Sequence, residues 1–177
     1  MNTANFEKVI AVLQEMQTDS IIEKYAIGGA FAATLHSEPI STIDLDIFFF
    51  LAEKSSSPIL SLTAVYKFAK SKGFSFDHEF INIYGWLVQF VEASHNSLWS
   101  EAIENAVKMK VGDFEVPVIN REHLAAMWLF AGRAKDFQKI TLFYEADILD
   151  ESNLFEILKR HDLMTKWNKE KGRFIYE

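Results

Sequence analysis

Residues 25–50 read YAIGGAFAATLHSEPISTIDLDIFFF, and this stretch decides the fold. Two adjacent glycines, Gly28 and Gly29, separate a short apolar run from a segment with the composition of a helix. Asp44 and Asp46 then alternate with apolar residues and lead into three phenylalanines. An unpaired charge beside so apolar a segment is costly. The two carboxylates are therefore expected to have a partner, and the nature of that partner decides the function.

The alternation in residues 41–53 predicts a strand on which Asp44 and Asp46 share one face. Its second half is apolar on both faces, which predicts a central strand with Phe48–Phe50 in the core. Two carboxylates about 7 Å apart on one face form a site for a hard divalent cation. Mg²⁺ prefers one or two carboxylates together with water and substrate phosphates. Thr42 is expected on the same face, where it would orient the site.

The glycine pair supplies the other half of this candidate site. Gly28 and Gly29 allow the backbone to approach a ligand closely, and the helix that follows presents free N–H groups to an anion. The stretch thus combines a phosphate-binding turn with a metal-holding strand. The alternative is that Asp44 and Asp46 are solvent-facing residues of a half-exposed strand, because short motifs also match by chance.

Composition narrows the class of protein. The chain has 177 residues, about half of them hydrophobic, which suits one domain with a sizeable core. It has no cysteine, which excludes disulfides and thiolate zinc sites and favours a cytoplasmic location. No run of about 18 apolar residues occurs and the N-terminus reads as an amphipathic helix, so no membrane contact is expected. The net charge of −7 gives no general attraction to nucleic acid.

The remaining patterns predict a mixed α/β half followed by a helical half. The fold class expected is α/β (α+β), with a small mixed sheet, flanking helices and a helical C-terminal segment. Residues 1–119 would form the core and residues 120–177 a helical segment packed on it as one compact unit. The supporting patterns are an amphipathic helix over 3–17, a helix over 55–73, one or two strands over 80–93 with a bend at Gly85, a short helix over 97–106, a hairpin over 107–119 and a helix capped by Asn120.

Two segments together carry a family resemblance. IGGAFAATLHSEPISTIDLDIFF, residues 27–49, resembles the signature of the nucleotidyltransferase superfamily with the DNA-polymerase-beta-like fold: an apolar residue, Gly-Gly or Gly-Ser, a helix, and an Asp-x-Asp strand. VPVINREHLAAMWLFAGRAKDFQKI, residues 116–140, resembles small bacterial nucleotidyltransferases, including toxin-type enzymes of abortive-infection and toxin–antitoxin systems. Those enzymes carry an Arg-x-Lys-Asp segment, here Arg133, Lys135 and Asp136.

The resemblance implies metal-dependent transfer of a nucleoside monophosphate from an NTP to a hydroxyl on RNA or protein. It implies that Asp44 and Asp46 hold Mg²⁺ or Mn²⁺ and serve catalysis together with Lys135. The toxin-type resemblance also implies a cognate toxin or antitoxin partner. The residues that it assigns to nucleotide binding are Gly28, Gly29, Thr42, Gln89, Arg133 and Asp136.

Three positions depart from the family pattern or complicate it. The superfamily usually has a third acid on a later strand, where this chain has Gln89, and an amide is a poor base or metal ligand. Glu92 is nearby but faces the opposite side of a strand. Lys139 occupies a place where the toxin-type pattern has a further Asp. The alternative function is therefore a catalytically degenerate nucleotidyltransferase fold that binds a nucleotide or a protein partner.

Other features favour ordinary structural roles. Lys135 and Lys139 are equally compatible with a solvated helix face. The basic stretch at residues 158–173 contains Trp167, on which an RNA base could stack, although a solvated C-terminal helix is the preferred interpretation. The five histidines are scattered, and no Walker A, G-x-G-x-x-G or G-x-S-x-G motif occurs.

Overall fold

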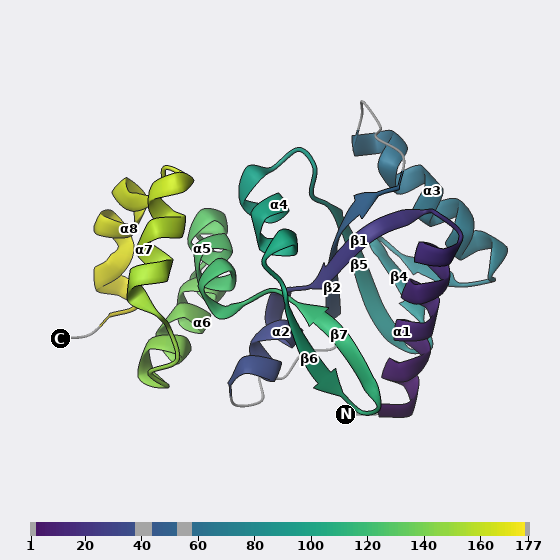
Figure 1. Cartoon of the computed structure of the whole chain (residues 1–177), viewed down its shortest axis with the longest axis horizontal. Helices are drawn as coiled ribbons and strands as arrows, with labels where there is room; N and C mark the ends of the chain where they lie inside the picture. The colour runs from purple at the N-terminus through teal and green to yellow at the C-terminus, as the bar shows by residue number, and fades with distance from the viewer. Residues whose placement is uncertain (1–2, 38–43, 53–57, 176–177) are drawn as a thin grey trace.

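The computed structural model describes residues 3–37, 44–52 and 58–175, so the predicted site residue Thr42 lies outside the described residues. The chain forms a mixed α/β structure in which helices surround one sheet, as the sequence predicts (Figure 1). The elements in chain order are α1 (Thr3–Thr18), β1 (Ile22–Ile27), α2 (Gly29–His36), β2 (Asp44–Leu51), α3 (Pro58–Ser71), β3 (Ser75–Asp77), β4 (Phe80–Ile83), β5 (Trp86–Glu92), α4 (Ser97–Glu104), β6 (Val107–Val111), β7 (Phe114–Val118), α5 (Arg121–Ala131), α6 (Ala134–Glu145), α7 (Glu151–Arg160), α8 (Met164–Glu170) and the 3-10 turn η1 (Lys171–Arg173).

The sheet has seven strands in the order β3-β4-β5-β2-β1-β7-β6. Strand β2 is the middle strand, which confirms the prediction from its doubly apolar second half. It pairs antiparallel with β1 and parallel with β5. Phe48 and Phe49 are buried and Phe50 packs against the core at its edge. The acidic residues at the start of β2 therefore lie on the middle strand of the sheet, between β1 and β5.

Two hairpins build the outer parts of the sheet. Strands β4 and β5 are joined at Tyr84 and Gly85, which have φ of 52° and 90° and make a tight turn. The predicted hairpin at residues 107–119 is also present, with Gly112 in the left-handed region. Strand β3 was not predicted: its three residues are all exposed, so no alternation of apolar and polar residues marks it.

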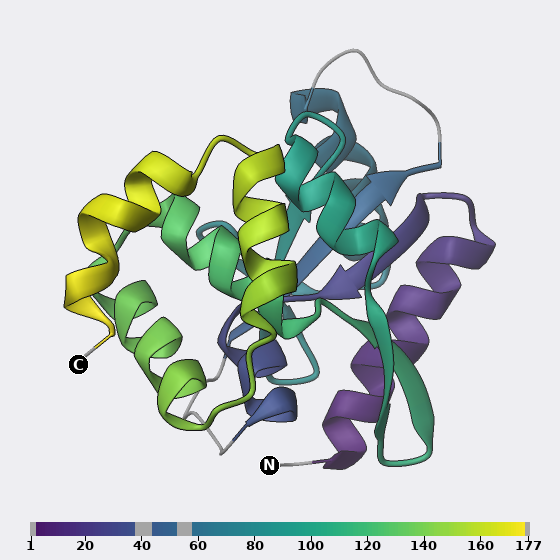
Figure 2. The same ribbon diagram turned by 60° about the vertical axis from the view of Figure 1, so that its left-hand side comes forward.

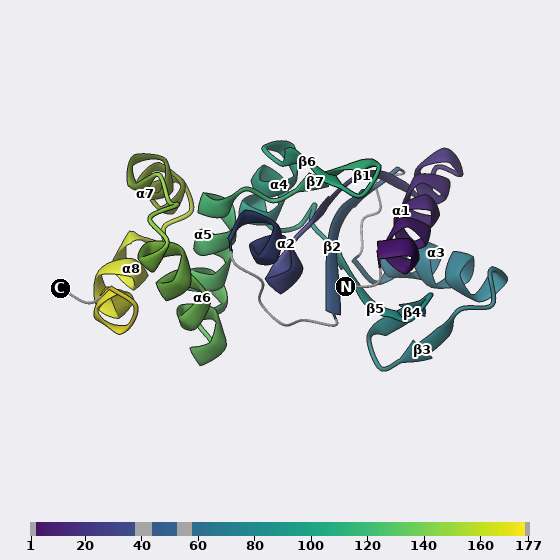
Figure 3. The ribbon, with the colours of Figure 1, turned by 90° about the horizontal axis from the view of Figure 1, so that it is seen from below.

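Helices cover the sheet on both sides. Figures 1 and 3 show α1 and α3 toward one end of the molecule, and α4 and the C-terminal helices toward the other. The predicted apolar stripe of α1 is buried. Its Phe6 stacks on Phe31 of α2 with the ring centroids 4.9 Å apart and meets Trp86 of β5 edge to face. These rings hold α1, α2 and β5 together.

The C-terminal helices join the sheet through α5. Its N-cap is Asn120, whose side-chain oxygen accepts a hydrogen bond from the His123 N–H at 2.9 Å, as predicted. Gly132, with φ of 71°, ends α5 and turns the chain into α6. Trp167 of α8 is buried against Phe155 and Phe174, so its ring faces are not open to an RNA base. None of the described helices has the length and apolarity to cross a membrane.

Glu101 of α4 connects three helices. It accepts hydrogen bonds from Arg160 and from His161 (2.7 Å), at the end of α7, and lies 3.2 Å from the ring nitrogen of His123 in α5. Figure 2 shows α7 running beside α4. The Arg160 guanidinium and the two imidazoles lower the pKa of Glu101 to about 2. At His123, burial lowers the pKa of the imidazole by more than the neighbouring Glu101 carboxylate raises it. The charged form of Glu101 therefore stabilises the packing of α7 on the core.

Replacing Glu101 with glutamine is expected to lower the free energy of unfolding by roughly 2–3 kcal/mol at pH 7. A carboxyl with a depressed folded pKa stabilises fully above its unfolded pKa near 4.5, and that contribution disappears as the pH falls toward 2. Urea melts of parent and E101Q from pH 7 to pH 2.5 should therefore converge at the acid end. Glu104→Gln, on the exposed side of the same helix, is the matched control and should change little.

Candidate functional site

The turn between β1 and α2 lies directly against β2. The Gly28 N–H donates to the Asp46 backbone oxygen at 2.8 Å, and the Ala32 N–H donates to the Gly28 oxygen at 3.1 Å as α2 begins. Gly29 has φ of 62°, and a Cβ placed on it would lie 1.7 Å from Oδ2 of Asp46. Glycine is thus required at this position both by its backbone conformation and by the space that the carboxylate occupies. The Asp46 carboxylate consequently lies at the N-terminal end of α2.

Asp44 and Asp46 lie on one face of β2. Asp44 is exposed and Asp46 half-buried, whereas Leu45 and Ile47 between and beyond them are fully buried on the other face. Burial raises the pKa of Asp46, and the neighbouring Asp44 charge raises it further. The charges of Lys139, Arg133 and Lys135 act in the opposite direction. A cation beside the two carboxylates would offset the repulsion between them.

The neighbouring strand presents an amide to this pair. In the parallel pairing of β2 with β5, Gln89 stands opposite Asp46, the position inferred from the sequence. Glu92 stands opposite Phe49, so it belongs to the other face. Its side chain is buried, and its Oε1 accepts a hydrogen bond from the Ser94 N–H at 2.9 Å. Glu92 therefore does not take the place of a third acid beside Asp46.

Two positively charged side chains near Asp46 come from α6 and its N-cap residue: Lys139 and Arg133. Asp136 is completely buried and accepts hydrogen bonds from Arg133 at 2.6 and 3.2 Å and from Lys139 at 3.3 Å. These bonds lower the pKa of Asp136 despite its burial. The buried carboxylate of Asp136 therefore orients the side chains of Arg133 and Lys139.

A pocket with a volume of about 440 Å³ brings these groups together. Its polar end contains the glycine turn, one carboxylate, the amide of β5 and the α6 cations. Its other end is apolar and aromatic, and Trp99 there meets Phe48 edge to face at 5.8 Å. The lining residues are Gly29, Asp46, Phe48, Gln89, Val91, Trp99, Leu124, Met127, Trp128, Phe130, Ala131, Arg133 and Lys139.

Some of the predicted site residues line the pocket at Asp46 and others do not. Lys135 is exposed and does not line the pocket, although its charge is felt by Asp46. Lys139 does line it, although the sequence marks it only as a departure from the toxin-type pattern and as compatible with a solvated helix face. The signal for Lys139 was its position three residues after Asp136, which places both on one side of a helix. Trp99 and Trp128 carried no sequence signal beyond being apolar.

The donor set bears on which metal the site fits. Among the described residues, no three His, Cys, Asp or Glu side chains converge as a metal site. Two carboxylates on one strand are nevertheless what Mg²⁺ or Mn²⁺ accepts when substrate phosphates and water complete the coordination. The Asp44–Asp46 pair, with the Asp46 carboxylate at the N-terminus of α2, has the donor atoms that such an ion needs.

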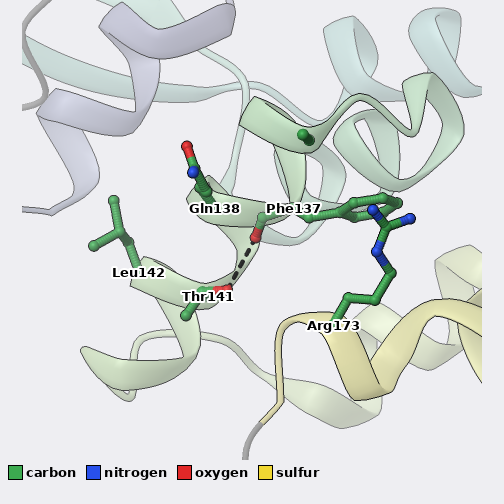
Figure 4. Close-up of a pocket in the computed structure, with 6 residues that line it drawn as sticks. Phe137, Gln138, Thr141, Leu142 and Arg173 are labelled. Atoms are coloured by element: carbon green, nitrogen blue, oxygen red, sulfur yellow. Dashed lines mark hydrogen bonds between the residues drawn. The ribbon is translucent and has the colours of Figure 1, made fainter.

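A second pocket, also of about 440 Å³, lies on another side of α6 (Figure 4). Figure 4 shows the Arg173 guanidinium against the Phe137 ring, from whose centroid it lies 4.6 Å away, with Thr141 and Leu142 one turn further along α6. As far as the described residues go, its lining contains no carboxylate. This lining therefore lacks the ligands for a divalent cation that the pocket at Asp46 has.

Comparisons with known proteins bear on the fold. A solved structure of the antibiotic-resistance factor ANT(2'')-Ia, an aminoglycoside nucleotidyltransferase, matches with a TM-score of 0.57. The match covers 97% of this chain and 95% of that one at 13% sequence identity. No protein-family model matches the sequence, and neither does any curated protein. The chain therefore has a nucleotidyltransferase-like fold.

Proposed function

We propose that this protein transfers a nucleoside monophosphate from an NTP to an acceptor hydroxyl. The observation that carries the proposal is the pocket at Asp46, where the Gly28-Gly29 turn, a carboxylate and the α6 cations meet on a nucleotidyltransferase-like fold. A triphosphate needs all three elements: backbone N–H groups, positive side chains and a metal-holding carboxylate.

The chain's own residues would divide the work as follows. The N-terminus of α2 and Arg133 hold the phosphates, and Asp44 and Asp46 hold a Mg²⁺ or Mn²⁺ ion. When bound, that ion supplies charge neutralisation and lowers the pKa of the attacking hydroxyl. The acceptor oxygen forms a bond to the α-phosphorus as the bond to the β-phosphate oxygen breaks. Pyrophosphate leaves with the electron pair, and the hydroxyl proton passes to an aspartate or to water.

A second function rests on Gln89. Its neutral amide stands opposite Asp46 where the related enzymes have an acid, which favours a degenerate site that binds a nucleotide without turnover or serves a protein partner. Such a protein would keep the pocket and its cations while losing the chemistry. From the toxin-type resemblance we also propose a cognate toxin or antitoxin as the protein partner, and RNA or protein as the acceptor.

Two measurements test these functions in sequence. The melting temperature is measured with each NTP, with and without Mg²⁺, and a rise that needs both ligands is expected. The NTP with the largest effect is then supplied with an α-phosphate label to total RNA, to protein and to aminoglycosides, the last because of the structural neighbour. Label transfer is expected. Stabilisation without transfer would favour the degenerate nucleotide-binding site. No stabilisation by any NTP would contradict both nucleotide-binding functions and leave the role in binding a protein partner.

A further inference from the structure

Lys139 is a cation held inside the candidate pocket. Its side chain is only 14% exposed, whereas that of Arg133 is 60% exposed. It lines the same cavity as Gly29, Asp46 and Gln89. Lys135, one turn earlier on α6, is exposed to solvent and lines no part of it. Of the two lysines, Lys139 is therefore the one placed to meet a ligand beside Asp46.

Two contacts fix this ammonium group in place. Its Nζ donates to Oδ1 of Asp136 at 3.3 Å and lies 5.3 Å from the centroid of the Trp128 ring. Asp136 also binds Arg133 through both carboxylate oxygens. An ammonium has three N–H donors, and Lys139 uses one of them within the described residues. The remaining donors are available to an anionic ligand, and the positive charge is present before the ligand arrives.

The charge pattern around Asp46 is unusual for a site that binds two divalent ions. Such sites use several carboxylates to offset the charge of two cations a few ångströms apart. Here the group in register with Asp46 is the neutral Gln89, and the charged groups that line the pocket on the α6 side are the cations Arg133 and Lys139. Among the residues that line the pocket, a second divalent ion would find no carboxylate beyond Asp46, and the ammonium would repel it.

We infer that the site takes one divalent cation per bound NTP, and that Lys139 supplies to the triphosphate the positive charge and the N–H donors of a second ion. This inference rests on the proposed binding of an NTP at Asp46. It makes Lys139 a substrate-contacting residue that the Arg-x-Lys-Asp comparison does not identify. It also gives Asp136 a specific purpose, because a buried carboxylate is what holds the ammonium at the pocket wall.

The test counts bound metal. The parent protein is titrated with Mn²⁺ in the presence of the α,β-methylene analogue of its most stabilising NTP, and bound Mn²⁺ is followed by electron paramagnetic resonance. One Mn²⁺ per chain is expected at saturation. Two Mn²⁺ per chain would overturn the inference while leaving the proposed function standing. Failure of the parent to bind any NTP analogue with Mn²⁺ would overturn the proposed function itself.

Variants supply the second arm. Lys139→Met should weaken binding of the analogue roughly 10- to 100-fold, since hydrogen bonds to charged groups are lost. The control Lys159→Met, at an exposed lysine of α7 that does not line the pocket, should change it less than about threefold. Equal affinity in parent and K139M would contradict the inference. Combining Gln89→Glu with Lys139→Met should raise the count to two Mn²⁺ per chain. If K139M does not fold, the count on the parent decides alone.

Discussion

Replacing Asp44 and Asp46 together by asparagine is expected to abolish the stabilisation that NTP and Mg²⁺ give, while leaving the ligand-free protein at least as stable. In the parent, free ligand at 100 times its Kd should add about 2.7 kcal/mol to the free energy of unfolding, and in the variant nothing. The ligand-free part follows from the raised pKa of Asp46. A carboxyl with a raised folded pKa destabilises the fold at neutral pH, so an amide relieves this cost.

Urea melts of parent and double variant at pH 7, with and without NTP and Mg²⁺, measure both parts. The control replaces Asp77 and Asp113, which are exposed and do not line the pocket, by asparagine and so makes the same change in net charge. It should keep the response to ligand. If Asp44 and Asp46 were structural, losing them would cost roughly 1–3 kcal/mol per group without ligand. If the double variant is less stable without ligand and the parent protein is not stabilised by NTP and Mg²⁺, Asp44 and Asp46 have only a structural role.

Gly29→Ala is expected to lower the free energy of unfolding by roughly 2–5 kcal/mol. A left-handed residue with a Cβ costs about 1–2 kcal/mol, and overpacking a filled site adds about 1–3 kcal/mol. Here the added Cβ meets Oδ2 of Asp46 at 1.7 Å. The variant should also lose its response to NTP and Mg²⁺, because the carboxylate has to move away from the turn.

A double-mutant cycle separates the two costs. Gly73→Ala is the control for backbone strain alone: its φ is 77° and a Cβ there meets nothing within 4 Å. Asp46→Ala removes the carboxylate. In the Gly29→Ala background it should restore the part of the free energy of unfolding that was lost through the clash between the new Cβ and Asp46. If Gly29→Ala costs no more than Gly73→Ala in equilibrium unfolding, the close contact between turn and carboxylate is not a rigid feature of the protein.

The sequence predicts those parts of the site that follow from local rules. Alternation along β2 places Asp44 and Asp46 on one face, and the glycine pair marks the turn before α2. The alignment of Gln89 with Asp46 follows from pairing two neighbouring strands. Each inference needs only the geometry of one element or of one strand pair.

The rest depends on how distant elements meet. Lys139 enters the pocket because Gly132 turns α6 back along α5 and because Asp136 is buried between them, which no periodicity shows. The Glu101 network joins α4 to α7 across nearly sixty positions, as its Arg160 bond illustrates. The exposed strand β3 has no apolar pattern at all. Tertiary packing, not local propensity, decides these features.

The position of β7 in the sheet has a consequence for how the protein is made. Strand β7 pairs with β1 at Ile27 and Val118, and the Ile119 N–H donates to the Ile27 oxygen. A ribosome therefore releases β1, the glycine turn and β2 long before the strand that covers the β1 edge has been synthesised. During that interval the nascent chain exposes an unpaired edge rich in apolar residues, a situation in which chaperones commonly intervene. Helix α6 follows β7 in the sequence. An incomplete polypeptide therefore contains Asp44 and Asp46 but lacks Lys139, which lines the same pocket as Asp46 in the complete fold.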